Sequence, residues 1–382
     1  MAKLTPMQRQ YYELKDQTPG AILLFRLGDF YEMFDEDAIK ASKILDITLT
    51  ARQKGGENEM KMCGMPYHSA EGYINKLTKA GEKVAICEQV SDPILPGIVE
   101  RKVVRIITPG TVLSENMLDH KSSNYLVSVS EYKGHFGLAY SDISTGQFCA
   151  TTISSFQLLK DEILRLNPAE ILLTKDSSLE SEVHSLGKNV SFWFTPPNPE
   201  KTLKDFFKVP HLKVFYIENE KEVIHSAAML LDYIMDTQRG ATKQIVKIQK
   251  YSNSDYLPID YSTLKNLEVF STLQEGKYQG SLLSVIDTTQ TASGGRKLKN
   301  WLIKPLKDIQ SIQQRLERVS DFCLSHKKRE QLRVALKETR DIERILGRVA
   351  SGRSNPKDLL ALKETLKNIP EIRSLVQSFS EK

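Results

Sequence analysis

The stretch AILLFRLGDFYEMF, residues 21–34, is the point from which the fold can be worked out. It starts with an unbroken apolar run, residues 21–25, bounded by Pro19-Gly20, which predicts a buried strand. Residues 35–45 follow as an amphipathic segment with acidic residues in its first turn, where a helix dipole favours negative charge. Between them, Phe30 and Glu32 stand two residues apart on what we expect to be a strand edge or a turn. Helix and strand therefore alternate from the start of the chain.

The same alternation continues to about residue 110. Residues 69–80 predict a helix ended by Gly81, and residues 83–89 and 102–107 predict strands. The polar stretch ARQKGGENEM, residues 51–60, contains two glycines and several charges, so we expect a mobile loop there. Residues 1–110 thus predict one mixed α/β domain.

Two further segments follow a connecting stretch at residues 111–123. In residues 124–240, strands at 125–132, 135–144 and 147–153, a helix at 154–166 and a strand at 169–173 give the order βββαβ. Residues 241–382 change to a helical period, with a helix capped by Asp308 and another that starts at Pro356 and ends at Pro370. The predicted fold class is a multidomain chain, mixed α/β in two domains and all-helical in the third.

Composition narrows the possible functions. The 382 residues carry 53 Lys plus Arg against 48 Asp plus Glu, a net charge of only +5, so any nucleic-acid binding must be local. The charge is uneven, because residues 111–238 sum to −6 and residues 239–353 to +10. Four scattered cysteines form no CxxC pair, and no apolar run reaches the ~20 residues that span a bilayer. We expect a cytoplasmic protein without disulfides, metal or a membrane anchor.

Phe30 and Glu32 form the first candidate site. An aromatic ring on a strand edge can wedge between base pairs in the minor groove while a neighbouring polar side chain tests a base edge. Unstacking costs least at a mispaired base, so such a wedge favours a lesion over normal duplex. The alternative from composition alone is that Phe30 and Phe34 are core aromatics and Glu32 is a solvated carboxylate.

Several segments together decide between these readings. FRLGDFYEMF at residues 25–34 is followed, in order, by DITLT from Asp46, CGMPYH from Cys63, VAICEQVSDP from Val84, VERKVVRIITPGT from Val99, GSLLSVIDTTQTASGGRKLKNWL from Gly280 and DIERILGRVASGRSNPKDL from Asp341. This series closely resembles the MutS family of DNA mismatch-recognition proteins over essentially the whole chain. The resemblance implies a mismatch-recognition domain at 1–110, a linker at 111–123, a connector domain at 124–240 and part of a helical core or lever domain at 241–382.

The resemblance also implies roles for individual residues. Phe30 corresponds to the aromatic that stacks on the mispaired or unpaired base and kinks the duplex, and Glu32 to the acid that hydrogen-bonds that base. A carboxylate near phosphates disfavours ordinary duplex, which gives specificity. Met65 and Pro66 are candidate second contacts in the groove, with a plain turn-and-core role as the alternative.

Several Lys and Arg residues of the first domain could contact DNA phosphates. The cations expected to reach phosphates are Arg52, Lys54, Lys61, Lys76 and Lys79, and the alternative for each is a solvated charged surface. The basic stretch 239–353 would be the first choice for DNA binding from charge alone. Since the resemblance implies that the family grips DNA elsewhere, we expect this charge to decorate packed helices or to flank the clamp domain.

Asp142 supports a rival function. A βββαβ order with an Asp on its first strands resembles a ribonuclease-H-like fold, in which that Asp would hold Mg²⁺ for phosphodiester hydrolysis. Such hydrolysis needs two or more converging carboxylates, and the nearby Asp161, Glu162 and Glu170 fall on a helix surface and a strand start. We interpret Asp142 as a turn former, in keeping with a family connector domain that has this fold without nuclease activity.

The motifs in the sequence and the family resemblance indicate which cofactors and partners to expect. It holds no Gly-x-x-x-x-Gly-Lys-Ser/Thr phosphate loop, so ATP hydrolysis by that route is excluded, and the ATP and Mg²⁺ of the family belong to an ATPase domain absent from these residues. We therefore expect an N-terminal fragment that is not an enzyme and is monomeric, whereas the full-length family is dimeric. The expected partners are duplex DNA with mismatches or small insertion/deletion loops and a MutL-type repair protein at the connector domain.

Overall fold

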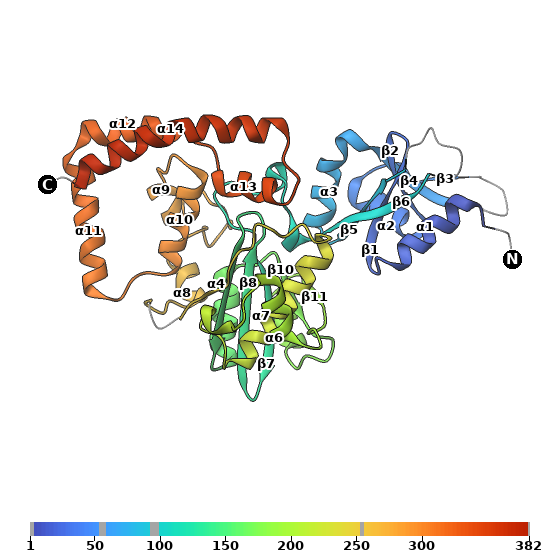
Figure 1. Cartoon of the computed structure of the whole chain (residues 1–382), viewed down its shortest axis with the longest axis horizontal. Helices are drawn as coiled ribbons and strands as arrows, with labels where there is room; N and C mark the ends of the chain where they lie inside the picture. The colour runs from blue at the N-terminus through green and yellow to red at the C-terminus, as the bar shows by residue number, and fades with distance from the viewer. Residues whose placement is uncertain (1–3, 53–58, 92–98, 253–255, 381–382) are drawn as a thin grey trace. The chain divides into compact units, whose positions relative to one another are not determined.

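The computed structural model describes residues 4–52, 59–91, 99–252 and 256–380. The chain divides into two compact units (Figure 1). The first comprises Met1–Met117 with Leu231–Thr242, and the second comprises Leu118–Leu230 with Lys243–Lys382. Among the described residues, no helix is both long and apolar enough to cross a membrane.

The first unit is built on a six-stranded sheet. Its strands are β1 (Ala21–Leu27), β2 (Phe30–Phe34), β3 (Thr50–Arg52), β4 (Met60–Pro66), β5 (Lys83–Gln89) and β6 (Arg101–Ile107). Their spatial order is β3-β4-β2-β1-β5-β6, with β1 and β5 parallel and the other neighbours antiparallel. The predicted strand at residues 21–25 is confirmed and extends to Leu27. Strand β2 is the strand expected, with a turn as the alternative, at Phe30 and Glu32. Strands β3 and β4 were not predicted, and they include residues 51–52 and 60 of the predicted loop, whose residues 53–58 lie outside the described residues.

Helices cover the two faces of this sheet. Helix α1 (Pro6–Asp16) begins at a capping box in which the Thr5 side chain accepts from the Gln8 N–H. Its Tyr11 ring meets Phe25 and Phe34 edge to face, with centroids 5.6 and 5.0 Å away. Helices α2 (Asp35–Leu45) and α3 (Ala70–Lys79) lie on the opposite face. The sequence predicted α2 and β5 with these same bounds.

The second unit contains another six-stranded sheet. Its strands are β7 (Leu126–Tyr132), β8 (His135–Asp142), β9 (Gln147–Ile153), β10 (Glu170–Leu173), β11 (Val190–Phe192) and β12 (Gln249–Lys250), in the order β11-β10-β7-β8-β9-β12. Strands β7, β8 and β9 form an antiparallel meander, and β10 pairs parallel to β7. The associated helices are α4 (Phe156–Leu166), α5 (Glu180–His184), α6 (Pro199–Phe207) and α7 (Lys221–Thr237). The predicted βββαβ order is confirmed.

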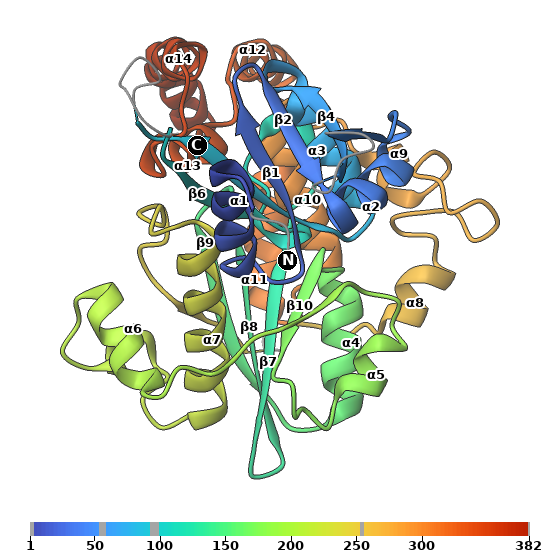
Figure 2. The same ribbon diagram turned by 90° about the vertical axis from the view of Figure 1, so that its right-hand side faces the viewer.

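Close packing holds the helices on this sheet. Figure 2 shows α4 and the first half of α7 on opposite sides of β7 and β8. On the α4 side, Leu159 and Ile163 join the apolar core. On the α7 side, a Cβ at Gly137 would lie 1.9 Å from the Glu222 carbonyl oxygen, so only glycine permits this approach.

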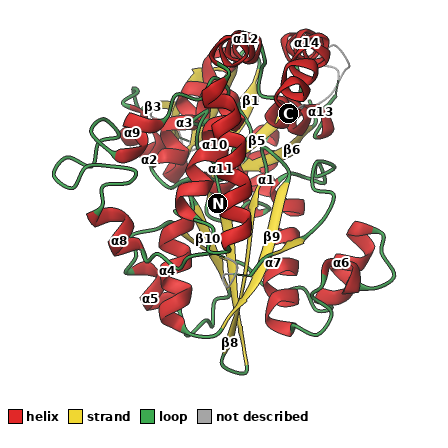
Figure 3. Cartoon of the chain, turned by 90° about the vertical axis from the view of Figure 1, so that its left-hand side faces the viewer, coloured by secondary structure: helices red, strands yellow, loops and turns green. Residues whose placement is uncertain are grey.

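The rest of the second unit is helical (Figure 3). Its helices are α8 (Tyr261–Asn266), α9 (Leu282–Ile286), α10 (Ala292–Ile303), α11 (Ile309–Leu324), α12 (His326–Lys337), α13 (Ile342–Ala350) and α14 (Pro356–Ser380). Asp308 caps α11 as predicted, because its side chain accepts from the Ser311 N–H. The prediction that Pro370 ends the last helix is wrong, since Pro370 lies inside α14. Pro370 is exposed, so water can satisfy the carbonyl group that its missing N–H leaves open.

Three arginines of residues 239–353, namely Arg296, Arg344 and Arg348, are buried. Arg296 binds Asp341 and Glu343, each at 2.6 Å, and Arg348 binds Asp358 at 2.5 Å. Arg344 is 1% exposed. Arg296 and Arg348 join helices to one another, a buried role that the expected decoration of packed helices did not include.

Candidate nucleic-acid interface

Phe30 is the most exposed aromatic of the motif that it belongs to. It is the first residue of β2 and is 48% exposed, whereas Phe25 and Phe34 are fully buried. Its backbone pairs with Leu27 on one side and Pro66 on the other. The core alternative therefore applies to Phe34 and not to Phe30, whose ring remains available to a ligand.

Glu32 lies on the same sheet face as Phe30, because side chains two residues apart on a strand point the same way. Its neighbours in the ladder are Phe25 on β1 and Gly64 on β4. A Cβ at Gly64 would lie 3.0 Å from the Tyr31 carbonyl oxygen and 3.4 Å from Glu32 Cγ. Glycine at this position leaves room for the Glu32 side chain against the sheet.

Arg52 is the ion-pair partner of Glu32. Its Nη1 lies 3.2 Å from Glu32 Oε2, and the two side chains are 43% and 18% exposed, respectively. Burial raises the pKa of the Glu32 carboxyl, and the positive charge of Arg52 opposes that rise. The carboxylate is thus poised closer to protonation than an ordinary surface glutamate.

Met65 and Pro66 are placed differently from each other. Met65 is 1% exposed and pairs with Tyr31, on the face covered by α2 and α3, so its side chain is core and is not offered to a groove. We expected Met65 to contact the groove, and its burial contradicts this. Because side chains alternate along a strand, the Met65 side chain points to the face opposite Glu32. Pro66 is partly exposed and lies opposite Phe30 on the same face.

The predicted phosphate-binding cations do not form one cluster. Arg52 shares the face of Glu32, whereas Lys61 follows Met60, the ladder partner of Arg52, and therefore points to the opposite face. Lys76 and Lys79 are exposed on α3, which covers that opposite face. Lys54 lies outside the described residues. The sheet thus separates Arg52 from the other described cations.

One feature beside Phe30 was missed by sequence reasoning. The Arg26 guanidinium lies 3.6 Å from the centre of the Tyr67 ring, and Tyr67 is 44% exposed. The Tyr67 N–H donates to the Asp29 carbonyl at 3.0 Å, which ties the end of β4 to the turn before Phe30. Tyr67 follows Pro66 directly, and the pairing of Pro66 with Phe30 brings it to this turn. Only that unpredicted register would have revealed the arrangement.

Asp142, the centre of the rival nuclease hypothesis, is fully buried. It accepts hydrogen bonds from the Ser144 N–H and Oγ–H at 3.0 and 2.6 Å and from the Asn124 N–H at 3.1 Å. Ser144 Oγ in turn accepts from Arg344 Nε at 3.2 Å. The Asp142 carboxylate therefore organises a turn and a helix contact.

A metal site at Asp142 has no support in the described part of the chain. No group of three or more His, Cys, Asp or Glu side chains there could hold a metal ion. Burial raises the pKa of Asp142, and its hydrogen bonds with Ser144 and the charge of Arg344 oppose the rise. The four cysteines, of which Cys323 is exposed, are free thiols. The nuclease hypothesis is not favoured.

Comparison with family models matches nearly the whole chain. Residues 5–116 match MutS domain I, residues 124–246 match MutS domain II, and residues 262–382 match MutS domain III. Phe30, Glu32 and the sheet face just described fall within the first match, and Asp142 falls within the second.

Individual relatives agree with these matches. The chain is 41% identical over its full length to the DNA mismatch repair protein MutS of Halothermothrix orenii and 42% identical over 99% of its length to that of Desulforamulus reducens. It is 40% identical to the protein of the same name from Syntrophobacter fumaroxidans. The chain spans 43–45% of the length of these relatives.

Proposed function

Because this chain belongs to the MutS family, we propose that its first unit binds duplex DNA at mispaired or unpaired bases in DNA mismatch repair, with Phe30 as the wedge. The observation that carries this proposal is that a half-exposed aromatic and a partly buried carboxylate lie on the same sheet face. The expected substrates are mismatches and small insertion/deletion loops.

Phe30 is suited to stack on a base. The backbone of Phe30 is held by the ladder on both sides, so little backbone freedom is lost when its ring inserts. Unstacking a base step costs a few kcal/mol and least at a mispair, so the same insertion binds a lesion more tightly than matched duplex. Insertion of this kind kinks the duplex, and Pro66 on the same face would meet the groove next to the ring.

Glu32 supplies the hydrogen bond to the base that Phe30 stacks on. Its pKa is already raised by burial, and covering it with DNA removes more water and raises the pKa further. A protonated carboxyl group can donate to a base nitrogen, whereas the ionised form would be repelled by the phosphates. Glu32 thereby favours a base whose hydrogen-bonding edge is free over one engaged in a normal pair.

Arg52 has two uses in this scheme. In the free protein it balances Glu32, and once Glu32 is protonated its guanidinium is released toward a phosphate on the same face. Lys61, Lys76 and Lys79 lie toward the other face and would contact DNA only if the duplex wraps around the edge of the sheet. We assign them a smaller part than Arg52.

Residues 124–240, most of which lie in the second unit, are proposed to act as a connector domain. Its meander followed by α4 and a parallel β10 is the strand order of a ribonuclease-H-like fold, and the buried Asp142 supports a structural role in that fold. Residues 111–238 carry a net charge of −6, which suits docking of a MutL-type repair partner. No catalytic residue is assigned to this chain.

ATP is not assigned to these residues. The 382 residues contain no phosphate-loop motif, and in the family ATP and Mg²⁺ belong to the ATPase domain. We infer that these 382 residues by themselves bind DNA with weak and salt-sensitive affinity, because phosphate contacts supply much of the binding energy.

Fluorescence anisotropy at low salt tests the proposal. The chain is titrated against duplexes that differ only in one G·T pair, one unpaired T, or a matched pair. We expect tighter binding to both lesions, and we expect Phe30→Ala to bind all three duplexes alike.

Tyr216→Ala is the matched control. Tyr216 is 79% exposed and lies in the second unit, so its loss removes a surface aromatic without touching the wedge face. This variant should keep the lesion preference. Equal loss of preference in both variants, or a lesion preference that survives Phe30→Ala, would overturn the assignment of Phe30.

A further inference from the structure

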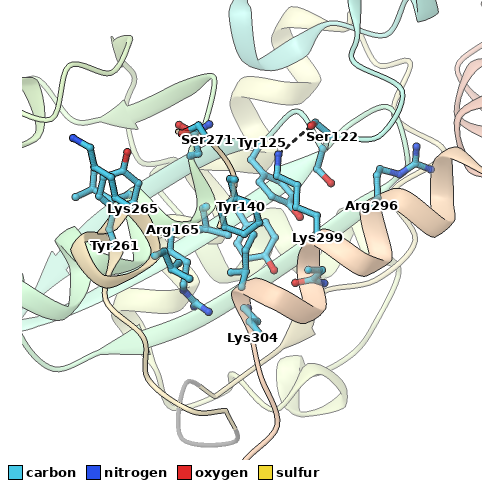
Figure 4. Close-up of a pocket in the computed structure, with 18 residues that line it drawn as sticks. Ser122, Tyr125, Tyr140, Arg165, Tyr261, Lys265, Ser271, Arg296, Lys299 and Lys304 are labelled. Carbon is cyan, nitrogen blue, oxygen red and sulfur yellow. Dashed lines mark hydrogen bonds between the residues drawn. The ribbon is translucent and has the colours of Figure 1, made fainter. Parts of the chain in front are cut away.

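A cavity of about 250 Å³ in the second unit combines cations with aromatic rings (Figure 4). Its lysines are held by different neighbours, since Lys299 Nζ donates to Ser122 Oγ at 3.0 Å and Lys304 Nζ lies 4.0 Å from the centre of the Tyr251 ring. The cavity therefore does not bring its ammonium groups to one point. Around Arg26 in the first unit, by contrast, charged and aromatic side chains converge on one turn of the backbone.

This turn consists of Gly28 and Asp29, the two residues between β1 and β2, and it directly precedes Phe30. Gly28 has φ +57°, a left-handed value that favours glycine at the first position of a two-residue hairpin turn. Leu27 pairs with Phe30 across the turn, which leaves the carbonyl groups of Gly28 and Asp29 outside the ladder. These two carbonyl groups must therefore bind water or another part of the protein.

Arg26 and Tyr67 bind both carbonyl groups. Arg26 Nε donates to the Gly28 carbonyl, and the Tyr67 N–H donates to the Asp29 carbonyl at 3.0 Å. The Arg26 guanidinium also lies 3.6 Å from the centre of the Tyr67 ring, well within cation–π distance. The two residues that hold the turn therefore also hold each other.

Glu88 on β5 holds the Arg26 guanidinium from the neighbouring strand. Its Oε2 lies 3.6 Å from Arg26 Nη1, and its Oε1 accepts a hydrogen bond from the Tyr31 hydroxyl. The Arg26 side chain is only 16% exposed, so water competes little for these contacts. A planar guanidinium bound at its edge by two acceptors and on its face by a ring has little freedom to turn.

The rigidity of this turn matters for a ring that inserts into DNA. Opening a base step costs a few kcal/mol, and least at a mispair. A Phe30 ring on a loose turn would move aside and leave the base step closed, so it would respond weakly to the difference between a lesion and a matched pair. Contacts with phosphates do not pass through the turn, and they would keep the affinity for matched duplex.

We propose that Arg26 is a positioning residue for the wedge, because it fixes the turn from which the Phe30 ring is presented to the groove. Tyr67 and Glu88 hold Arg26 in the orientation that this role requires. Arg26 acts through the turn and makes no contact with a base. This inference rests on the proposed function of Phe30 and adds a residue that determines its specificity.

Fluorescence anisotropy with Arg26→Lys tests the proposal on a G·T duplex and a matched duplex. Lysine keeps the charge but lacks the Nε donor and the planar face that stacks on Tyr67. The preference for the G·T duplex should fall about three- to tenfold, and the affinity for matched duplex should stay unchanged. Tyr67→Leu removes the same stack from the other side, so the double variant should lose little more preference than either single variant.

NMR relaxation of the free chain gives a second readout that needs no DNA. The backbone amides of Gly28 and Asp29 should have order parameters near the ~0.85 of rigid backbone in the wild-type chain, and clearly lower values in Arg26→Lys. Unchanged order parameters in the variant would show that Arg26 does not hold the turn and would overturn the proposal.

Arg9→Lys is the matched control, since it makes the same change at an exposed position of α1. It should behave like wild type in both measurements, and thermal unfolding checks that each variant is folded.

The outcomes separate this proposal from the function on which it rests. If the wild-type chain shows no lesion preference, the proposed function of Phe30 fails and the role of Arg26 fails with it. If the wild-type chain prefers the lesion and Arg26→Lys keeps that preference, only the role of Arg26 is overturned. It is also overturned if Arg26→Gln weakens binding to all duplexes alike and lowers the salt dependence, because Arg26 would then be a phosphate contact.

Discussion

Glu32 and Asp142 are two carboxylates on strands of two different sheets, and burial raises the pKa of both. Glu32 keeps 18% of its side chain exposed, beside an exposed aromatic ring and the partly exposed Arg52. Asp142 is fully buried, and its oxygens accept hydrogen bonds from Asn124 and Ser144. A carboxylate whose hydrogen bonds are already made within the protein supports the fold, whereas one left partly open can serve a ligand.

The largest effect expected from this contrast is on folding. Asp142→Ala removes the acceptor for two backbone N–H groups and one hydroxyl and should lower the free energy of unfolding by about 3–5 kcal/mol. Urea unfolding followed by circular dichroism measures it. Asp176→Ala, at an exposed aspartate of the same unit, should stay within about 0.5 kcal/mol of wild type. Similar values for both would mean that Asp142 is not a structural centre.

Gly347→Ala probes the same turn from the helix packed on it. A Cβ at Gly347 in α13 would lie 2.3 Å from the Ser144 carbonyl oxygen, so the helix must shift, and we expect destabilisation by about 1–3 kcal/mol. Gly72→Ala in α3, where no atom lies within 4 Å, should instead stabilise by about 0.5–1 kcal/mol. Thermal unfolding of both variants measures these changes in stability. A stabilising effect of Gly347→Ala would contradict the close packing of α13 against the Ser144 carbonyl.

Phe30→Ala should have a small effect on stability. Since the ring is already half-exposed, its removal should lower the free energy of unfolding by less than about 1 kcal/mol. Phe34→Ala, on the same strand but fully buried, should cost about 3–5 kcal/mol. Chemical unfolding of the two variants measures this difference in the free energy of unfolding. Equal losses for Phe30→Ala and Phe34→Ala would mean that the Phe30 ring belongs to the core.

The smallest expected effect is on the ionisation of Glu32. Arg52→Gln should raise the pKa of Glu32 above its wild-type value, because Arg52 stabilises the carboxylate. NMR titration of the Glu32 side-chain carboxyl carbon measures this, and Lys61→Gln, on the opposite face, should leave the value unchanged.

The sign of the linked stability change follows from the same shift. Because the folded pKa exceeds the unfolded one, the stability contributed by protonated Glu32 is present below the unfolded value of about 4.5 and is lost as pH rises through the folded pKa. Arg52→Gln should extend that loss to higher pH. An unchanged pKa would show that the ion pair has no influence in solution.

Local elements were largely predictable from the sequence. Helix α2 and strand β5 have the predicted bounds, and the meander β7–β9 with α4 and β10 appears in the predicted order. Apolar periodicity, caps and bounding glycines act over a few residues, so one stretch of sequence carries them. The resemblance placed Phe30 and Glu32 together, and strand alternation explains why they share a face.

What only the tertiary structure decided depends on residues far apart in the chain. The sequence by itself determined the order of elements and the adjacency of Phe30 and Glu32. It did not show that Met65 is buried or that Lys61 faces away from Arg52, because both follow from the register of β2, β3 and β4. It likewise did not show that Arg344, 200 residues beyond Ser144, completes the surroundings of Asp142, or that Lys299 and Lys304 share a cavity with Tyr140. Burial and pairing are properties of the assembled surfaces, so the role of a charged residue is settled only when its neighbours in space are known.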